Sequence, residues 1–277
     1  MEFDANSPLF VVVIAVLLLG SMLFFLTVGT NITDKMWVVF FLLLGGAVLF
    51  IFGFFTLSRK RLIQNTPTSK IRSIAMGLVE VYGEVVPSKE NVLKSPLTGK
   101  SCVYYKYDIQ ELRSTGKQSS WITIDGGTDM AEFFLKDDTG LVLIDPNGAS
   151  IDVKPDFSYQ TGLMRSEPPK QVLNFLQSRG IAHEGLFGIN KGMKFAEYVI
   201  EPKDKLYVLG TAGDNPFVEE ATGKESTADI MIQKGGKVYL ISDKSEKEVL
   251  KGMTLGVGAG LLLGPLLIVI GLALLLF

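Results

Sequence analysis

Residues that bind zinc or form disulfides are almost absent from this sequence, which has one cysteine, Cys102, and one histidine, His183, among 277 residues. A single cysteine excludes an intrachain disulfide. A structural zinc site takes about four cysteine or histidine ligands, so we expect no metal site and no cofactor. We also expect Cys102 to be a small buried apolar residue rather than a nucleophile. Its one candidate base, His183, lies far along the chain in a glycine-rich segment.

Catalytic motifs are missing as well. The glycines of residues 125–128 lack the lysine that a phosphate-binding P-loop requires. No serine stands in the pattern of a nucleophile elbow, and the acid pair Asp137-Asp138 is typical of a solvated turn. The sequence therefore predicts no intrinsic catalytic centre.

An excess of charge of one sign is also lacking. All but one of the 27 lysines and arginines, and all but three of the 29 acids, lie within residues 58–252, which are electroneutral as a whole. Nucleic-acid binding normally requires a basic domain or stripe. We therefore expect no nucleic-acid partner.

Long uncharged runs are what the sequence does have, at residues 9–28, 37–57 and 253–277. A helix needs roughly 20 apolar residues to cross the hydrocarbon layer, and backbone groups in lipid must be bonded within their own segment. The first run has no basic segment before it, which disfavours a cleaved signal peptide. We therefore predict three transmembrane helices in a multi-pass membrane protein.

Basic residues flank these runs unequally. Arg59, Lys60 and Arg61 follow the second run, and Lys247 and Lys251 precede the third. The opposite side of the membrane has a single basic residue, at position 35. Because basic residues favour the cytoplasmic side, the water-soluble part is predicted to be cytoplasmic.

The water-soluble part is predicted to contain a juxtamembrane linker, residues 58–75, followed by a mainly β domain, residues 76–252. Short runs rich in Val, Ile and Tyr, separated by turn residues, are typical of small β barrels and sandwiches. One helix is predicted to begin near Pro168, end at Gly180 and pack on a sheet.

A weak internal repeat indicates two related β units. Residues 78–84 resemble residues 205–211, and residues 134–145 resemble residues 231–243. The first unit is predicted to be enlarged by a hairpin inserted around residues 95–125.

A turn before one predicted strand is the leading candidate for an interaction surface. It comprises Ser95, Pro96, Leu97, Thr98, Gly99 and Lys100. Proline suits the second position of a turn and glycine tolerates positive φ, so an exposed β-turn is expected. The alternative, which we favour, is that the turn only sets the register of a hairpin.

Glycines recur at every fourth position of the third apolar run, at Gly256, Gly260 and Gly264. This spacing lets two helices approach closely. Packing within the chain, against glycines of the other runs, is favoured over formation of a homodimer.

Three stretches, residues 95–105, 197–210 and 241–248, resemble the GIDE domain, and the resemblance spans roughly residues 68–253. GIDE domains occur in membrane-anchored mitochondrial RING-type E3 ubiquitin ligases and in prokaryotic relatives. The resemblance implies ligase activity in a carboxyl-terminal RING, whose zinc ligands this sequence lacks. It also implies an intermembrane-space domain, against the charge count.

These observations favour a non-enzymatic binding or scaffold protein that presents a GIDE-like domain at the bilayer to an unknown protein partner or to lipid. The alternative is an accessory subunit of a ubiquitin-ligase-like or protease quality-control system. A hydrolase with an unrecognised site is the least favoured reading.

Overall fold

A computed structural model describes residues 32–88, 92–115, 118–162, 167–182, 191–215, 230–236 and 238–276. The chain forms two compact units, a β domain at Pro67–Ser245 and a helical unit built from the segments before and after it. The predicted membrane helix at residues 9–28 lies outside the described residues. The structure therefore shows candidate spans for two of the three predicted transmembrane helices, those at residues 37–57 and 253–277.

The helical unit contains two helices that are long and apolar enough to cross a membrane, Met36–Asn65 and Glu246–Leu276. The first belongs to α2 (Ile32–Asn65). The second consists of α4 (Glu246–Gly258), the π-helical turn η4 (Ala259–Leu263) and α5 (Gly264–Leu276). The π-helical turn ends at Leu263, two residues before Pro265, whose missing N–H and ring disturb a regular helix.

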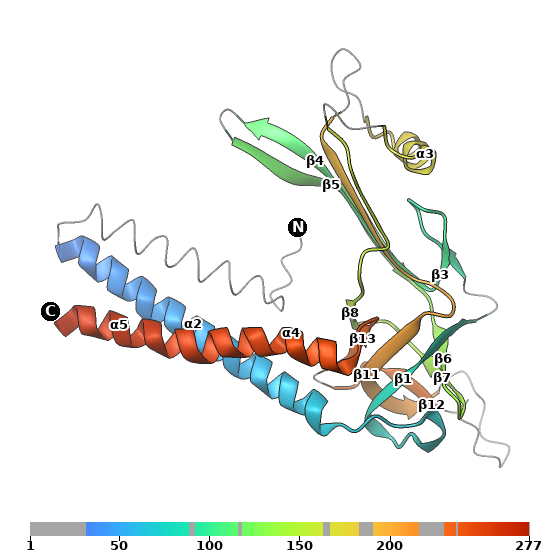
Figure 1. The fold of residues 1–277 in the computed structure, drawn as a ribbon, viewed down its shortest axis with the longest axis horizontal. Coiled ribbons are helices and arrows are strands. Elements are labelled where there is room, and N and C mark those ends of the chain that lie inside the picture. Colours follow the sequence, from blue (N-terminus) through green and yellow to red (C-terminus); the bar gives the residue numbers. More distant parts are fainter. Residues whose placement is uncertain are drawn as a thin grey trace. The chain divides into compact units, whose positions relative to one another are not determined.

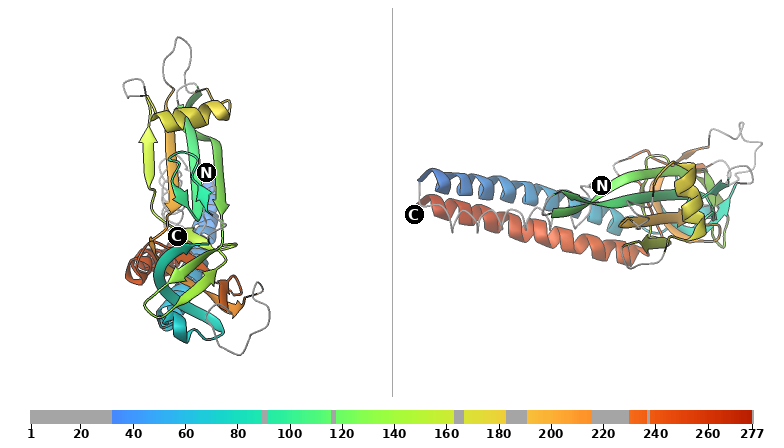
Figure 2. Two further views of the ribbon diagram at one scale, coloured as in Figure 1. Left: turned by 90° about the vertical axis from the view of Figure 1, so that its right-hand side faces the viewer. Right: turned by 90° about the horizontal axis from the view of Figure 1, so that it is seen from above.

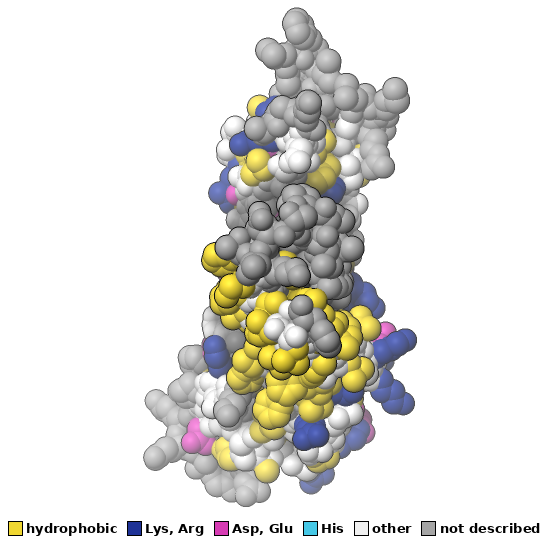
Figure 3. Space-filling view, turned by 90° about the vertical axis from the view of Figure 1, so that its left-hand side faces the viewer, with side chains coloured by type: hydrophobic (Ala, Val, Ile, Leu, Met, Phe, Trp, Pro, Cys, Tyr) yellow, Lys and Arg dark blue, Asp and Glu magenta, His cyan; other side chains and the backbone are white. Residues whose placement is uncertain are grey.

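The two spans run antiparallel, side by side (Figure 2). Their shared core contains Val38, Leu42, Leu49 and Leu267. Many other apolar side chains point outward, and Figure 3 shows hydrophobic side chains gathered over this surface. An apolar exterior of this size suits lipid better than water.

The β domain is built around a seven-stranded sheet in the order β1-β6-β7-β12-β11-β13-β8 (Figure 1). A further pairing of β1 with β11 closes part of it into a barrel-like form. The strands are β1 (Gly77–Pro87), β6 (Phe133–Lys136), β7 (Leu141–Ile144), β8 (Ser150–Asp152), β11 (Lys205–Asp214), β12 (Ile230–Gln233) and β13 (Leu240–Ser242).

The strands that carry the predicted repeat are neighbours in this sheet. β1 and β11 pair antiparallel from Gly77↔Ala212 to Glu84↔Lys205. β6 then pairs with the end of β1, and β12 with the end of β11. The predicted β units therefore share one sheet, and their sequence relationship stays a prediction.

A second, four-stranded sheet has the order β5-β4-β10-β9. Its long hairpin, β4 (Tyr104–Thr115) and β5 (Gln118–Met130), lies slightly beyond the hairpin predicted around residues 95–125. The other strands are β9 (Phe157–Gln160) and β10 (Met193–Ile200).

The predicted helix is present as α3 (Lys170–Ser178), which lies across one end of the four strands (Figures 1 and 2). Its buried Val172 and Leu176 share a cluster with Ile109 and Phe195 of the sheet. The apolar spacing of this helix thus covers one face of the second sheet.

The residues predicted to form a linker are ordered against other elements. α2 continues to Asn65. The N–H of Ser69 donates to the carbonyl of Glu80 at 2.7 Å, and the short 3₁₀ helix η1 (Ile71–Ser73) contributes the fully buried Ile71 to the barrel core. Residues 58–65 therefore extend α2, and residues 67–75 belong to the β domain.

Candidate functional site

The 95–100 turn connects two short strands, β2 (Leu93–Lys94) and β3 (Ser101–Cys102). The N–H of Ser95 donates to the carbonyl of Lys100 at 2.9 Å, and its hydroxyl accepts from the N–H of Lys100 at 3.1 Å. Gly99 has φ of +70°, a conformation that glycine adopts without steric cost. These contacts define one closed conformation for the turn.

A buried carboxylate holds the turn against the second sheet. Glu197 on β10 is 0% exposed, and its oxygens accept hydrogen bonds from the N–H of Leu97 at 2.7 Å and from Thr98. Thr98 donates both its N–H, at 3.1 Å, and its hydroxyl, at 2.5 Å. Three donors satisfy a charge that would otherwise be costly to bury.

The turn is therefore much less exposed than the sequence indicated. Ser95 is 3% exposed and Leu97 is 1% exposed, and Leu97 packs in the cluster beneath α3. Of the six residues, only Gly99 is largely exposed. The expectation of an exposed β-turn was wrong in this respect, because Leu97 and Glu197 draw the turn onto the sheet.

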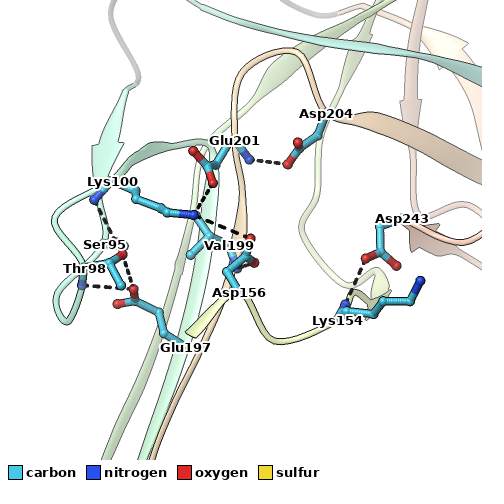
Figure 4. A network of polar contacts seen from close by, with 10 residues as sticks. All are labelled: Ser95, Thr98, Lys100, Lys154, Asp156, Glu197, Val199, Glu201, Asp204 and Asp243. Carbon is cyan, nitrogen blue, oxygen red and sulfur yellow. Dashed lines mark hydrogen bonds and ion pairs between the residues drawn. The ribbon is translucent and has the colours of Figure 1, made fainter. Parts of the chain in front are cut away.

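Lys100 links the turn to a group of carboxylates (Figure 4). Its Nζ lies 2.5 Å from Glu201 Oε1 and 3.8 Å from Asp156 Oδ1. The hydrogen bond from Lys100 to Glu201 raises the pKa of the lysine. Asp156 in turn accepts the N–H of Val199 at 3.0 Å. The lysine thus stays charged and joins three separate segments of the chain.

Asp204 completes this network at the turn between β10 and β11. Its Oδ2 accepts the N–H of Glu201 at 2.7 Å. Burial raises the pKa of Asp204, and the hydrogen bond from Glu201 opposes that shift only in part. The carboxylate therefore carries an electrostatic cost at neutral pH, whereas its hydrogen bond from the N–H of Glu201 helps to close the turn.

A pocket of about 290 Å³ lies beside the network, within the β domain. On one side of it, Asp243 Oδ2 accepts the N–H of Lys154 at 3.0 Å. The lining is mixed, with charged and apolar residues: Val153, Lys154, Pro155, Asp156, Val199, Ile200, Asp204, Lys205, Leu206 and Asp243. This lining is more polar than that of the mostly apolar pockets that bind drug-sized ligands.

The chemistry of the site gives little support to catalysis. Cys102 is buried, and burial, followed by the nearby carboxylates of Glu197 and Glu201, raises the pKa of its thiol to about 11. A thiol in that state is a poor nucleophile at neutral pH. His183 lies outside the described residues, and within those that are described no three His, Cys, Asp or Glu side chains are grouped to hold a metal ion.

Sequence reasoning missed the carboxylates that organise the turn. Glu197 could have been found in part. It shares one face of β10 with the apolar Phe195 and Val199, so the strand pattern places a charge on a buried face. Asp156 carried no comparable signal. Its position depends on contacts between segments that are distant in sequence.

Of the three glycines at the predicted four-residue spacing, two pack closely against α2. A Cβ at Gly260 would lie 2.7 Å from the carbonyl oxygen of Leu49 and would also meet Gly53. A Cβ at Gly264 would lie 2.9 Å from the carbonyl oxygen of Gly46. Gly256 is looser, since its nearest neighbour would be Thr56 Cγ2 at 3.8 Å. The close approach thus involves residues 260 and 264 within one chain.

The fold and site define a mainly β domain continuous at both ends with membrane-type helices. The family model described as "GIDE: E3 Ubiquitin ligase" matches residues 104–274, which is more than half of the chain. The chain therefore belongs to the GIDE family. The match contains Glu197 and both closely packed glycines, whereas the 95–100 turn precedes it. No curated protein and no solved structure matches the chain.

Proposed function

We propose that this chain is a membrane-anchored binding protein, which presents its GIDE domain at the membrane surface to a protein partner in a ubiquitin-ligase-related process and has no catalytic activity of its own. One observation carries the proposal. The β domain, Pro67–Ser245, continues at both ends into helices that are long and apolar enough to cross a membrane. Two anchors of this kind hold a domain near the bilayer, where it meets other membrane proteins.

The site supports binding rather than chemistry. Glu197 holds the 95–100 turn in a single conformation, and Lys100 is paired with Glu201. A surface that is already ordered loses less conformational entropy when it binds a partner. We propose the outer edge of this turn, next to the exposed Lys94, as the contact region.

A second candidate function is that of an accessory subunit, whose catalytic step belongs to another chain. The description of the family as an E3 ubiquitin ligase favours it. The single cysteine and histidine of these 277 residues agree with it, since a RING requires more zinc ligands than they supply.

The two candidates are distinguished by cross-linking in native membranes. A photoreactive residue replaces Lys94 beside the turn, and a matched control replaces the exposed Ser178 at the end of α3. The binding proposal requires a product that forms at position 94 and not at position 178. Capture of a ligase or protease subunit at position 94 favours the accessory role, and equal products at both positions contradict the turn as the contact region.

The absence of catalysis has its own test. The purified full-length chain is incubated with activating enzyme, conjugating enzyme, ubiquitin and ATP. We expect no ubiquitin transfer above that of a reaction without the chain. Ubiquitin transfer that depends on adding the chain would overturn the proposal that it is not catalytic, and would not affect the proposal that it is anchored in the membrane.

The proposed orientation places the β domain in the cytoplasm. Lys60 Nζ lies 2.7 Å from Thr254 Oγ1, so the basic end of α2 lies beside α4, which carries Lys247 and Lys251. Clustering of basic residues at one end of both spans supports a cytoplasmic location for that end. In sealed vesicles, a cysteine replacing the exposed Lys106 should react with an impermeant reagent only from the cytoplasmic side. Labelling only from the other side reverses the assignment.

A further inference from the structure

The four-stranded sheet has one long edge. β5 (Gln118–Met130) pairs with β4 along its length, and among the described residues no strand pairs with its outer side. The opposite edge, β9, has only four residues, Phe157–Gln160. The N–H and C=O groups along an open edge form a template for another strand.

This edge has few of the features that usually prevent strand pairing. Residues 118–130 contain no lysine, arginine or proline. Ile122 is 38% exposed, and Leu112 on the adjacent strand β4 is 41% exposed. A register shift between Ile109 and Gln110 and two glycines interrupt the half nearer Met130. The half from Gln118 to Ile122 is regular and accessible.

We propose that β5 is an interface between two copies of this chain, in which the β5 strands pair antiparallel about a twofold axis and join the two sheets into one. Charge restricts the register. Asp125 and Asp129 are the charged residues of the strand, and an axis at Asp125 places the two Asp125 side chains opposite each other. An axis at Gly127 opposes Asp125 to Asp129. An axis between Trp121 and Thr123 avoids both repulsions.

A second copy fits this edge better than an unrelated strand. Both ends of the domain continue into candidate membrane helices, so copies in one bilayer share a surface and meet at a high effective concentration. The antiparallel contact also covers the exposed Ile122 with a strand rich in β-branched residues. A twofold contact closes on itself and does not extend into fibres.

Disulfide trapping of the full-length protein in native membranes tests the register. Single cysteines replace Gln118, Ile122, Thr123 or Thr128 in a Cys102→Ala background. In an antiparallel twofold pair, equivalent residues move apart by about 7 Å for each position from the axis. We expect the dimer yield to be highest at position 122 and to fall at least tenfold by position 128.

Control cysteines replace Lys106, which is exposed on the central strand β4, and Ser178 at the end of α3. Neither should form a dimer. A profile without a maximum near position 122, or equal yields at the controls, overturns the proposal.

A second measurement keeps the native Cys102. Ile122→Lys adds a charge to the edge, and Ser178→Lys is the matched control with the same charge. We expect the mass of the complex in lipid nanodiscs to change from dimer to monomer for Ile122→Lys only, with the melting temperature of both variants unchanged. A dimer that survives Ile122→Lys, or a wild-type protein that is monomeric in the nanodisc, excludes this interface.

Discussion

The carboxylate of Glu197 accepts hydrogen bonds from both the N–H and the hydroxyl of Thr98, which precedes it by 99 residues. This pair fastens the turn before β3 to the middle of β10. The turn and the sheet therefore form one structural element.

Replacing Glu197 by glutamine should destabilise the β domain, because the amide nitrogen is a donor and leaves one of the turn's donors without an acceptor. The cost of an unpaired buried donor is about 1–3 kcal/mol. Chemical denaturation of the full-length protein in a Trp37→Phe background, followed by the fluorescence of Trp121, measures the change. Glu201→Gln is the matched control, since the pair of Glu201 with Lys100 is partly exposed and is expected to contribute less than about 1 kcal/mol. Equal losses for the two variants would contradict the structural role of Glu197.

Sequence alone predicted most of the local structure of the β domain. The helix predicted to end at Gly180 and the short strands rich in Val, Ile and Tyr are present, because apolar spacing and turn residues are local signals. The position of each strand within the sheet could not be predicted from such local signals. The repeat marked β1 and β11 as equivalents, and the structure makes them neighbours.

Dependence on distant contacts also explains why the structure of the juxtamembrane segment and of the candidate site was not predicted. Thr68 and Ser69 look like linker residues because they are polar, yet the hydroxyl of Thr68 donates to Glu80 at 2.5 Å and the N–H of Ser69 to the carbonyl of the same residue. Pairing of this kind depends on a partner elsewhere in the chain. Local propensity was therefore enough to predict helices and strands, whereas the candidate site depends on contacts between residues distant in sequence.

Asp137 should make the β domain sensitive to acid. Burial disfavours its charge, but hydrogen bonds from the N–H groups of Ile71, Thr139 and Gly140 and from the Thr139 hydroxyl outweigh burial and lower its pKa below 3.8. Because the folded pKa is depressed, the stabilisation is present above pH 3.8 and is lost as the pH falls through the folded value. Denaturation at pH 3 and pH 6 should show a smaller difference for Asp137→Asn than for wild type. An unchanged difference would exclude Asp137 as a source of the acid sensitivity.

Asp204 should affect the pH dependence of stability in the opposite direction to Asp137. Burial raises its pKa above 3.8, so the folded state binds its proton more tightly than the unfolded state does. Stability is therefore highest below pH 3.8 for this group and decreases as the pH rises through the folded value. Asp204→Asn keeps an oxygen that accepts the N–H of Glu201 and removes the charge. The variant should lose this decrease and be at least as stable as wild type at pH 7, and a loss above about 2 kcal/mol would show that the charge itself is needed.

Cys102 should be inert in the folded protein. It is buried, and burial raises the pKa of its thiol to about 11, so little thiolate exists near neutral pH. Iodoacetamide at pH 7.5 should modify it at least a hundredfold more slowly than in denaturant, as measured by mass spectrometry. A Lys106→Cys variant, with its new thiol on the surface, supplies a reactive control in the same molecule. Equal rates at both positions would contradict the buried environment of Cys102.

The glycines of the second span differ enough to be tested against each other. A methyl group at Gly260 would meet the backbone of Gly53 and the carbonyl of Leu49, and backbone contacts of this kind cannot relax by rotation of a side chain. Gly260→Ala should therefore weaken the packing of α2 against η4 and α5 by about 1–3 kcal/mol, as overpacking does elsewhere. Gly256→Ala is the matched control, since Thr56 Cγ2 would lie at an ordinary contact distance of 3.8 Å. Unfolding in detergent micelles, followed by cross-linking between cysteines placed on the two spans, should detect the difference. Equal tolerance of both substitutions would mean that the spans do not approach at residues 53 and 260.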